Sequence, residues 1–152
     1  MNDRARRKKR ASALGSLRET ITLKGTVVTG FRHFSRRMTE FPEAFWRATG
    51  ENLYPGTLNV DVAKEIKIRE DRRIVGTEIG EPYQDLLFER CLVNGLPAWR
   101  IRPYVLDERA GFPVGGGGHG DHILEISCAT KIPNASAGCT VDITLFRENL
   151  EG

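Results

Sequence analysis

Short strand-like runs, several of which alternate apolar and polar residues and which are bounded by turn-forming residues, recur along most of this chain and constrain its fold more than any other feature. The clearest runs cover residues 21–29, 57–62, 85–93, 96–106, 123–128 and 139–146. Asn94-Gly95 joins two of these runs, and this dipeptide is the strongest short signal for a β-hairpin. Segments 65–69 and 72–79 are predicted to be further short strands. Many short strands with regular turns are typical of a small closed or nearly closed β-barrel.

The sequence predicts one short helix within this mainly β chain. Pro42 lies near its first turn, and Gly50 ends it after about Thr49. Its apolar stripe is best explained by core packing and consists of Phe41, Phe45 and Trp46. Segments 30–37 and 107–120 are predicted to be loops, and 130–138 a connector or a single helical turn.

Length and composition favour a single soluble domain, which we expect to cover residues 20–148. The chain has 152 residues, of which 39% are hydrophobic and 28% charged. It contains no apolar run near the roughly 18 residues that span a membrane, and no hydrophobic segment follows its basic start as in a secretory signal. The three cysteines lack CxxC spacing, which favours reduced thiols and a cytoplasmic location.

Positive charge is concentrated at the start of the chain. Residues 1–10 hold six Lys or Arg side chains and one Asp, so the net charge of this segment is +5. The net charge of the whole chain is +3, so the remaining residues sum to −2. We predict that residues 1–19 form a disordered basic tail. Such a tail could contact nucleic acid or another anionic surface, but a tail without a specific partner is the favoured interpretation. The sequence leaves the oligomeric state open.

The segment Leu53–Val62 combines a turn with the most regular strand. Pro55-Gly56 is typical of a type II turn. In the strand that follows, the apolar side chains of Leu58, Val60 and Val62 face one side, and the polar side chains of Thr57, Asn59 and Asp61 face the other. Residues two apart on a strand lie roughly 6.5 Å apart, so Thr57 and Asn59 could contact one ion or phosphate group. A solvated polar face is the alternative interpretation.

Two further patterns suggest sites of other kinds. Residues 115–120 formally match GxGxxG, but they lead into a strand rather than a helix, so a dinucleotide fingerprint is rejected. A substrate lid and a plain mobile loop are equally consistent with this segment. His119 and His122 could both bind a metal ion, but no third ligand is evident, so a metal site there is not favoured.

Three segments resemble the CTP-dependent, archaeal-type riboflavin kinases. Residues 55–60 (PGTLNV) resemble a signature of that family, residues 24–30 (KGTVVTG) its first strand, and residues 119–126 (HGDHILEI) a later strand. The resemblance runs from about Leu23 to Phe146. It implies a six-stranded Greek-key barrel of the cradle-loop type. The implied reaction transfers the γ-phosphate of CTP to riboflavin and gives FMN and CDP.

The resemblance also implies roles for individual residues. Thr57 and Asn59 would bind Mg²⁺, and Glu125 would be the catalytic residue that orients or deprotonates the attacking hydroxyl. Riboflavin would be bound by Gly117, His119 and Glu125. The nucleotide would be bound by Gly30, Arg32, Ser35, Thr130 and Lys131.

The chain departs from the family pattern after the first strand. The family has a G-x-G-E-G loop there, whereas this chain keeps Gly30 and has Arg32 and Phe34 at the later glycine positions. Arg32, together with Arg36 and Arg37, could bind phosphate by charge instead of by close backbone approach. Gly117 also stands where the family often has threonine. Two alternatives follow: a kinase of the same fold with another small hydroxylated acceptor, or a non-catalytic barrel that binds a nucleotide or nucleic acid.

Overall fold

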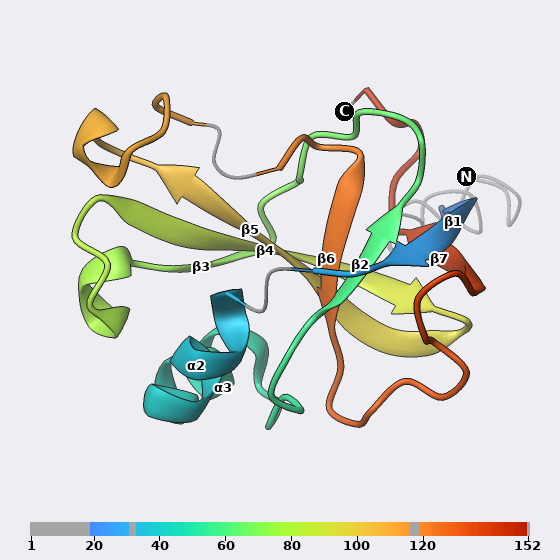
Figure 1. Cartoon of the computed structure of the whole chain (residues 1–152), viewed down its shortest axis with the longest axis horizontal. Helices are drawn as coiled ribbons and strands as arrows, with labels where there is room; N and C mark the ends of the chain where they lie inside the picture. The colour runs from blue at the N-terminus through green and yellow to red at the C-terminus, as the bar shows by residue number, and fades with distance from the viewer. Residues whose placement is uncertain (1–18, 31–32, 116–118, 152) are drawn as a thin grey trace, which may run out of the picture.

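A computed structural model of the chain describes residues 19–30, 33–115 and 119–151. Seven strands make up the sheet of the described part (Figure 1): β1 (Ile21–Val28), β2 (Leu58–Asp61), β3 (Arg72–Ile74), β4 (Gln84–Val93), β5 (Leu96–Val105), β6 (Ile123–Ser127) and β7 (Thr140–Leu145). Their order is β3-β4-β5-β6-β2-β1-β7, and β4 also pairs with β7. Six strands therefore close into an antiparallel barrel with β3 as an extra strand, which confirms the predicted mainly β, six-stranded barrel. The predicted tail lies outside the described residues except for Glu19.

Strand β4 closes the barrel because its two halves have different neighbours. Residues 86–88 pair with β3, residues 91–93 pair with β7, and β5 pairs with β4 along its whole length. Asn94 and Gly95 form the turn between β4 and β5, with φ values of 49° and 80°. Positive φ at both central residues is what a tight two-residue hairpin needs. The predicted hairpin is confirmed.

Segment 65–69 was predicted to be a strand, and this prediction is wrong. Three of its backbone groups bind buried side chains, and the Ile66 N–H donates to the Asp121 carbonyl at 3.2 Å, which lies outside the strands. Arg100 Nη2 donates to the Ile66 carbonyl at 2.5 Å, Arg147 Nη2 donates to the Lys67 carbonyl at 2.7 Å, and the Arg69 N–H donates to Glu89 at 3.1 Å. Because these partners satisfy the backbone, the segment needs no β ladder.

The predicted strand over residues 72–79 is only partly correct. Arg72–Ile74 forms β3, but Gly76–Ile79 is a 3-10 helix, η1. The N–H of Gly76 donates to Asp85 at 2.8 Å, and a Cβ at Gly76 would lie 1.8 Å from the Gln84 carbonyl oxygen. This close approach turns the chain away from the sheet.

The structure contains two short α-helices in its described part, whereas the sequence predicted one. Helix α3 (Pro42–Thr49) begins at Pro42 and ends at Gly50 in the left-handed conformation, φ 73°, as predicted. Helix α2 (His33–Glu40) replaces most of the predicted loop over residues 30–37, so that prediction is wrong. Phe34 and Met38, four residues apart, both bury their side chains, and this packing stabilises the helix.

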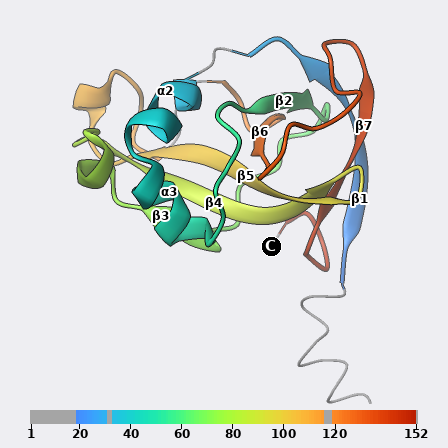
Figure 2. The same ribbon diagram turned by 90° about the horizontal axis from the view of Figure 1, so that it is seen from below.

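The barrel strands carry a buried apolar layer on each face. One layer fills the barrel interior and includes Val60, Leu124 and Ile126. The other lies beneath α2 and α3, which sit together on one side of β3, β4 and β5 (Figure 2). The ring of Phe88 packs edge-on between Phe45, at a centroid distance of 5.9 Å, and Trp99, at 6.4 Å. This aromatic stack attaches the helices to the barrel.

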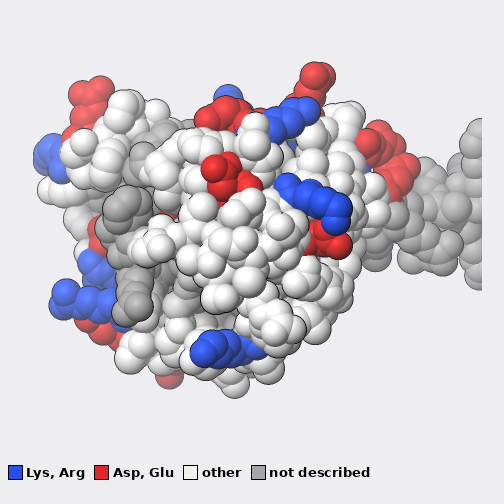
Figure 3. Space-filling view, turned by 45° about the vertical axis from the view of Figure 1, so that its right-hand side comes forward, with Lys and Arg blue, Asp and Glu red and all other residues white. Residues whose placement is uncertain are grey.

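Figure 3 shows how charged side chains are distributed over one face of the molecule. Lys and Arg side chains there are scattered among Asp and Glu side chains, and uncharged residues cover most of that face. Neither α-helix of the described chain has the length or the apolar character needed to span a lipid bilayer.

We expect Phe88→Ala to lower the free energy of unfolding by about 3–5 kcal/mol, because the side chain is fully buried between the helices and the sheet. Trp46→Ala is the matched control, since this aromatic residue of α3 is 53% exposed and should cost less than about 0.5 kcal/mol. Urea denaturation measures both. Equal losses in the two variants would contradict this account of the packing.

Candidate functional site

Asn59 of β2 and Glu125 of β6 lie directly opposite each other in the antiparallel ladder. Their side chains therefore share one face of the sheet, while Val60 and Leu124 point into the barrel core. Asn59 and Glu125 are each only 6% exposed. The alternative of a solvated polar face is therefore wrong at these two positions.

Gly30 lies against Asn59 of this pair. A Cβ atom at Gly30 would be 1.6 Å from Nδ2 of Asn59. The amide of Asn59 therefore occupies the space that any side chain at position 30 would need. This contact explains why a glycine is required there, and it brings a predicted nucleotide-binding residue beside a predicted metal ligand.

The two carboxylate oxygens of Glu125 have different partners. Oε1 lies 2.6 Å from Nε2 of His119, which is a short charge-assisted hydrogen bond. Oε2 accepts a hydrogen bond from the Thr57 hydroxyl at 3.5 Å, near the outer limit for such a bond. The structure thus brings together Thr57, Asn59, His119 and Glu125, which the sequence assigned to metal binding, substrate binding and catalysis.

His119 is held from its other side by Arg102. Arg102 Nη2 donates to the His119 carbonyl at 2.8 Å, and Nη1 lies 3.3 Å from the ring Nδ1. Asp121 in turn binds Nε of Arg102 at 2.7 Å. The hydrogen bond to Glu125 raises the pKa of His119 above its ordinary value, although partial burial opposes this effect. Sequence reasoning missed Arg102, although an arginine between apolar residues of a predicted strand was a usable signal.

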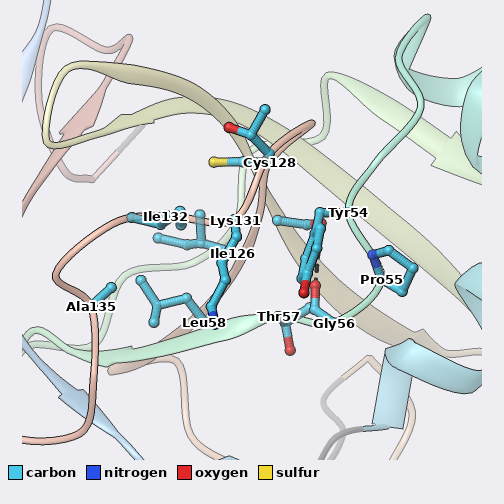
Figure 4. Close-up of a pocket in the computed structure, with 12 residues that line it drawn as sticks. Tyr54, Pro55, Gly56, Thr57, Leu58, Ile126, Cys128, Lys131, Ile132 and Ala135 are labelled. Atoms are coloured by element: carbon cyan, nitrogen blue, oxygen red, sulfur yellow. Dashed lines mark hydrogen bonds between the residues drawn. The ribbon is translucent and has the colours of Figure 1, made fainter.

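A pocket of about 450 Å³ opens beside this polar cluster. Figure 4 shows Leu58, Ile126 and Ile132 converging on it, with the Thr57 hydroxyl at its edge and directed away from them. Thr130 and Lys131, which were predicted to bind the nucleotide, also line the pocket. Thr57 both lines the pocket and donates a hydrogen bond to Glu125. Leu58 and Ile126 of the pocket face the barrel core, whereas Asn59 and Glu125 face the other side of the strands, so the pocket and the polar cluster adjoin at Thr57.

Of the remaining predicted residues, the structure describes only Ser35. Arg32 and Gly117 lie outside the described residues. Ser35 lies in α2, where its carbonyl accepts a hydrogen bond from Thr39 at 3.0 Å, and its side chain makes no described hydrogen bond to the site. The nearby cations Arg36 and Arg37 already pair with carboxylates, Arg36 with Glu40 and Arg37 with Glu40 and Glu81. Their charge is therefore compensated within the fold.

The donor atoms at the site are mainly oxygens, which hard cations such as Mg²⁺ prefer, whereas imidazole nitrogens suit zinc-like ions. Among the described residues, no three His, Cys, Asp or Glu side chains gather as metal ligands. His119 binds Glu125, whereas His122 binds Glu65 at 3.1 Å, so the two histidines do not share one site. The hydroxyl of Thr57 and the amide of Asn59 are neutral oxygen donors on the same face of the chain at β2.

No protein-family model matches this chain, and no curated protein matches it at a significant level. The fold and the site define a small β-barrel with a buried polar cluster beside an apolar pocket. The site must therefore be interpreted from its own residues, contacts and motifs.

The raised pKa of His119 predicts a pH-dependent contribution to stability. Because the folded-state pKa exceeds that of the unfolded chain, ~6.5, the contribution is complete below that value and is lost as the pH rises through the folded pKa. We expect His119→Gln to lower the melting temperature more at about pH 5.5 than at about pH 9. Thermal melts across this range measure the difference, and a penalty independent of pH would contradict the assignment.

Proposed function

We propose that this chain is a Mg²⁺-dependent phosphotransferase that transfers the γ-phosphate of CTP to riboflavin. One observation carries the proposal: Thr57 and Asn59 of the PGTLNV segment meet Glu125 of the HGDHILEI segment in a single buried cluster. The two segments lie more than sixty residues apart, so their resemblance to one family is matched by contact in space.

The residues present fit a magnesium ion. Thr57 and Asn59 offer neutral oxygen donors, and Mg²⁺ commonly keeps several waters and takes its anionic ligands from substrate phosphates. The close packing of Gly30 against the Asn59 amide holds that amide in place. Bound there, Mg²⁺ would neutralise the negative charge of the nucleotide phosphates.

The adjoining pocket fits the nucleotide. Its apolar walls, which include Tyr54, Leu58 and Ile132, suit a planar base. Lys131 lies at the exposed rim and offers a positive charge to phosphate oxygens. The phosphate chain would then extend past Thr57 toward Glu125, because Thr57 borders both parts of the site.

Glu125 would act on the acceptor. Among the described residues, its Oε2 has only the long hydrogen bond from Thr57, so this oxygen would be the one to accept a hydrogen bond from a substrate hydroxyl. As the terminal ribityl oxygen bonds to the γ-phosphorus, the bond from that phosphorus to the β–γ bridging oxygen breaks and CDP leaves. The hydroxyl proton passes to Glu125. Positioning and charge neutralisation supply most of the rate enhancement in such reactions.

The direct test is to incubate the protein with riboflavin, Mg²⁺ and each of CTP, ATP, GTP and UTP, and to quantify FMN by chromatography. We expect FMN with CTP, and none once the metal is chelated. Transfer to a different hydroxylated acceptor would favour the alternative kinase. Nucleotide binding without any turnover would favour the non-catalytic barrel.

Asn59→Ala should reduce turnover roughly 10–100-fold, as is typical when a metal site loses a ligand or its support. Raising the Mg²⁺ concentration should recover part of the loss. Asp61→Asn is the matched control, since Asp61 is the next polar position on the same face of β2 but binds the Ala63 N–H at 2.8 Å. Normal turnover by the Asn59 variant would remove this residue from the site.

Gly30→Ala should impair turnover without removing any functional group. The new methyl group would overlap the Asn59 amide and force it out of position, and displacements of about 1 Å can cost as much as 10²-fold in rate. The neighbouring exposed Thr29, changed to Ala, is the control. Steady-state kinetics of both variants decide whether the Gly30–Asn59 contact matters for the reaction.

A further inference from the structure

We propose that His119 and Arg102 are positioning residues for Glu125. They hold one of its carboxylate oxygens in a hydrogen bond, so that the other oxygen can accept a hydrogen bond from the acceptor hydroxyl. This inference rests on the proposed function, because it concerns the group assigned there to the attacking hydroxyl. It adds Arg102, which lies outside the segments that suggested the reaction, and Asp121, a residue of the HGDHILEI segment to which no role was assigned.

The two carboxylate oxygens of Glu125 are held unequally. Oε1 is bound at 2.6 Å by His119, whereas Oε2 has a hydroxyl at 3.5 Å. A carboxylate held firmly at one oxygen cannot rotate without breaking that bond. The remaining oxygen therefore keeps a fixed direction, as a proton acceptor in phosphoryl transfer requires.

The imidazole ring of His119 is held in either protonation state. Its Nδ1 lies 3.3 Å from Nη1 of Arg102 and 3.0 Å from the Gly120 carbonyl oxygen. The neutral ring, protonated at Nε2, can accept from Arg102 at Nδ1, and the imidazolium can donate from Nδ1 to the carbonyl. Nε2 donates to Glu125 in both cases, so the orientation of the carboxylate does not depend on the charge of the ring.

Arg102 is itself fixed. Its side chain is 9% exposed, and Asp121 binds Nε at 2.7 Å. The two terminal nitrogens are then directed at the His119 ring and carbonyl. A planar guanidinium provides this fork of donors and a lysine ammonium does not. The chain of contacts from Asp121 through Arg102 and His119 to Glu125 is the arrangement in which one residue orients the next toward a reacting group.

The experiment first measures FMN formation by the wild-type protein, and then by Arg102→Met, His119→Leu and His119→Gln. We expect kcat to fall ~10–100-fold in the first two variants, with KM for CTP and riboflavin changed less than about threefold. Glutamine places an amide donor near the position of Nε2, so His119→Gln should recover most of the rate. The double variant of Arg102→Met and His119→Leu should be no slower than the slower single variant, because both changes act through Glu125.

The control variant is Arg109→Met. Arg109 also pairs with an aspartate, Asp107, at 3.0 Å, but on the exposed 3-10 turn η2 (Glu108–Ala110). It should keep the wild-type kcat. Melting temperatures are measured for every variant. If Arg102→Met or His119→Leu fails to fold, Asp121→Asn replaces it in the experiment. Asp121 is partly exposed, and its substitution removes the charge that holds Arg102. This variant should lower kcat and leave KM unchanged.

The outcomes separate the two proposals. A wild-type protein that phosphorylates no acceptor overturns the proposed function and this inference with it. An active wild type whose Arg102, His119 and Asp121 variants keep the normal kcat overturns the positioning role alone. The role is also overturned if His119→Gln is as slow as His119→Leu and both lose equal stability, because the histidine would then be only structural.

Discussion

The buried carboxylate of Glu89 connects the two strands between which the barrel closes. Glu89 lies on β4 and is fully buried, and Arg147, just after β7, binds it at 2.6 Å and 2.5 Å through two nitrogens. A buried carboxylate that lost this partner would cost several kcal/mol. Arg100 lies 3.7 Å away, and burial lowers its pKa to about 10, so it stays protonated at neutral pH. Closure of the barrel and pairing of these charges therefore depend on each other.

Closure also determines the geometry of the candidate site. In the closed barrel β2 lies between β1 and β6, and the register places Asn59 opposite Glu125. A shift of β2 by one residue would turn Asn59 into the apolar interior, where Val60 now packs. The burial of one face thus specifies the register that brings the polar groups together on the other. The same β1–β2 pairing brings Gly30, just beyond β1, against Asn59.

Local sequence patterns predicted most of the barrel but not every element. Strand-like runs and the Asn94-Gly95 turn located the six barrel strands correctly, because both signals are local. The helix over His33–Glu40 was missed because its apolar contacts are few, and only the barrel surface shows that Phe34 and Met38 are buried. Segment 65–69 reads as a strand, yet its backbone partners are arginine and glutamate side chains from distant segments. No local pattern encodes such partners.

The site shows the same division between local and long-range information. Alternation predicted that Thr57 and Asn59 share one face of a strand. That Asn59 lies opposite Glu125 follows only from the strand pairing. The contact between Arg102 and His119 forms only because the loop that holds His119 returns to β5. On this face of the sheet, Trp99 and Ile101 pack against the helices, whereas their neighbours Ser127 and Glu125 are polar. Apolar residues at these buried positions would satisfy the requirements of folding more simply. Polar groups that break the local rule and are nevertheless buried and paired are typical of functional sites. This physical argument for a site does not depend on the proposed reaction.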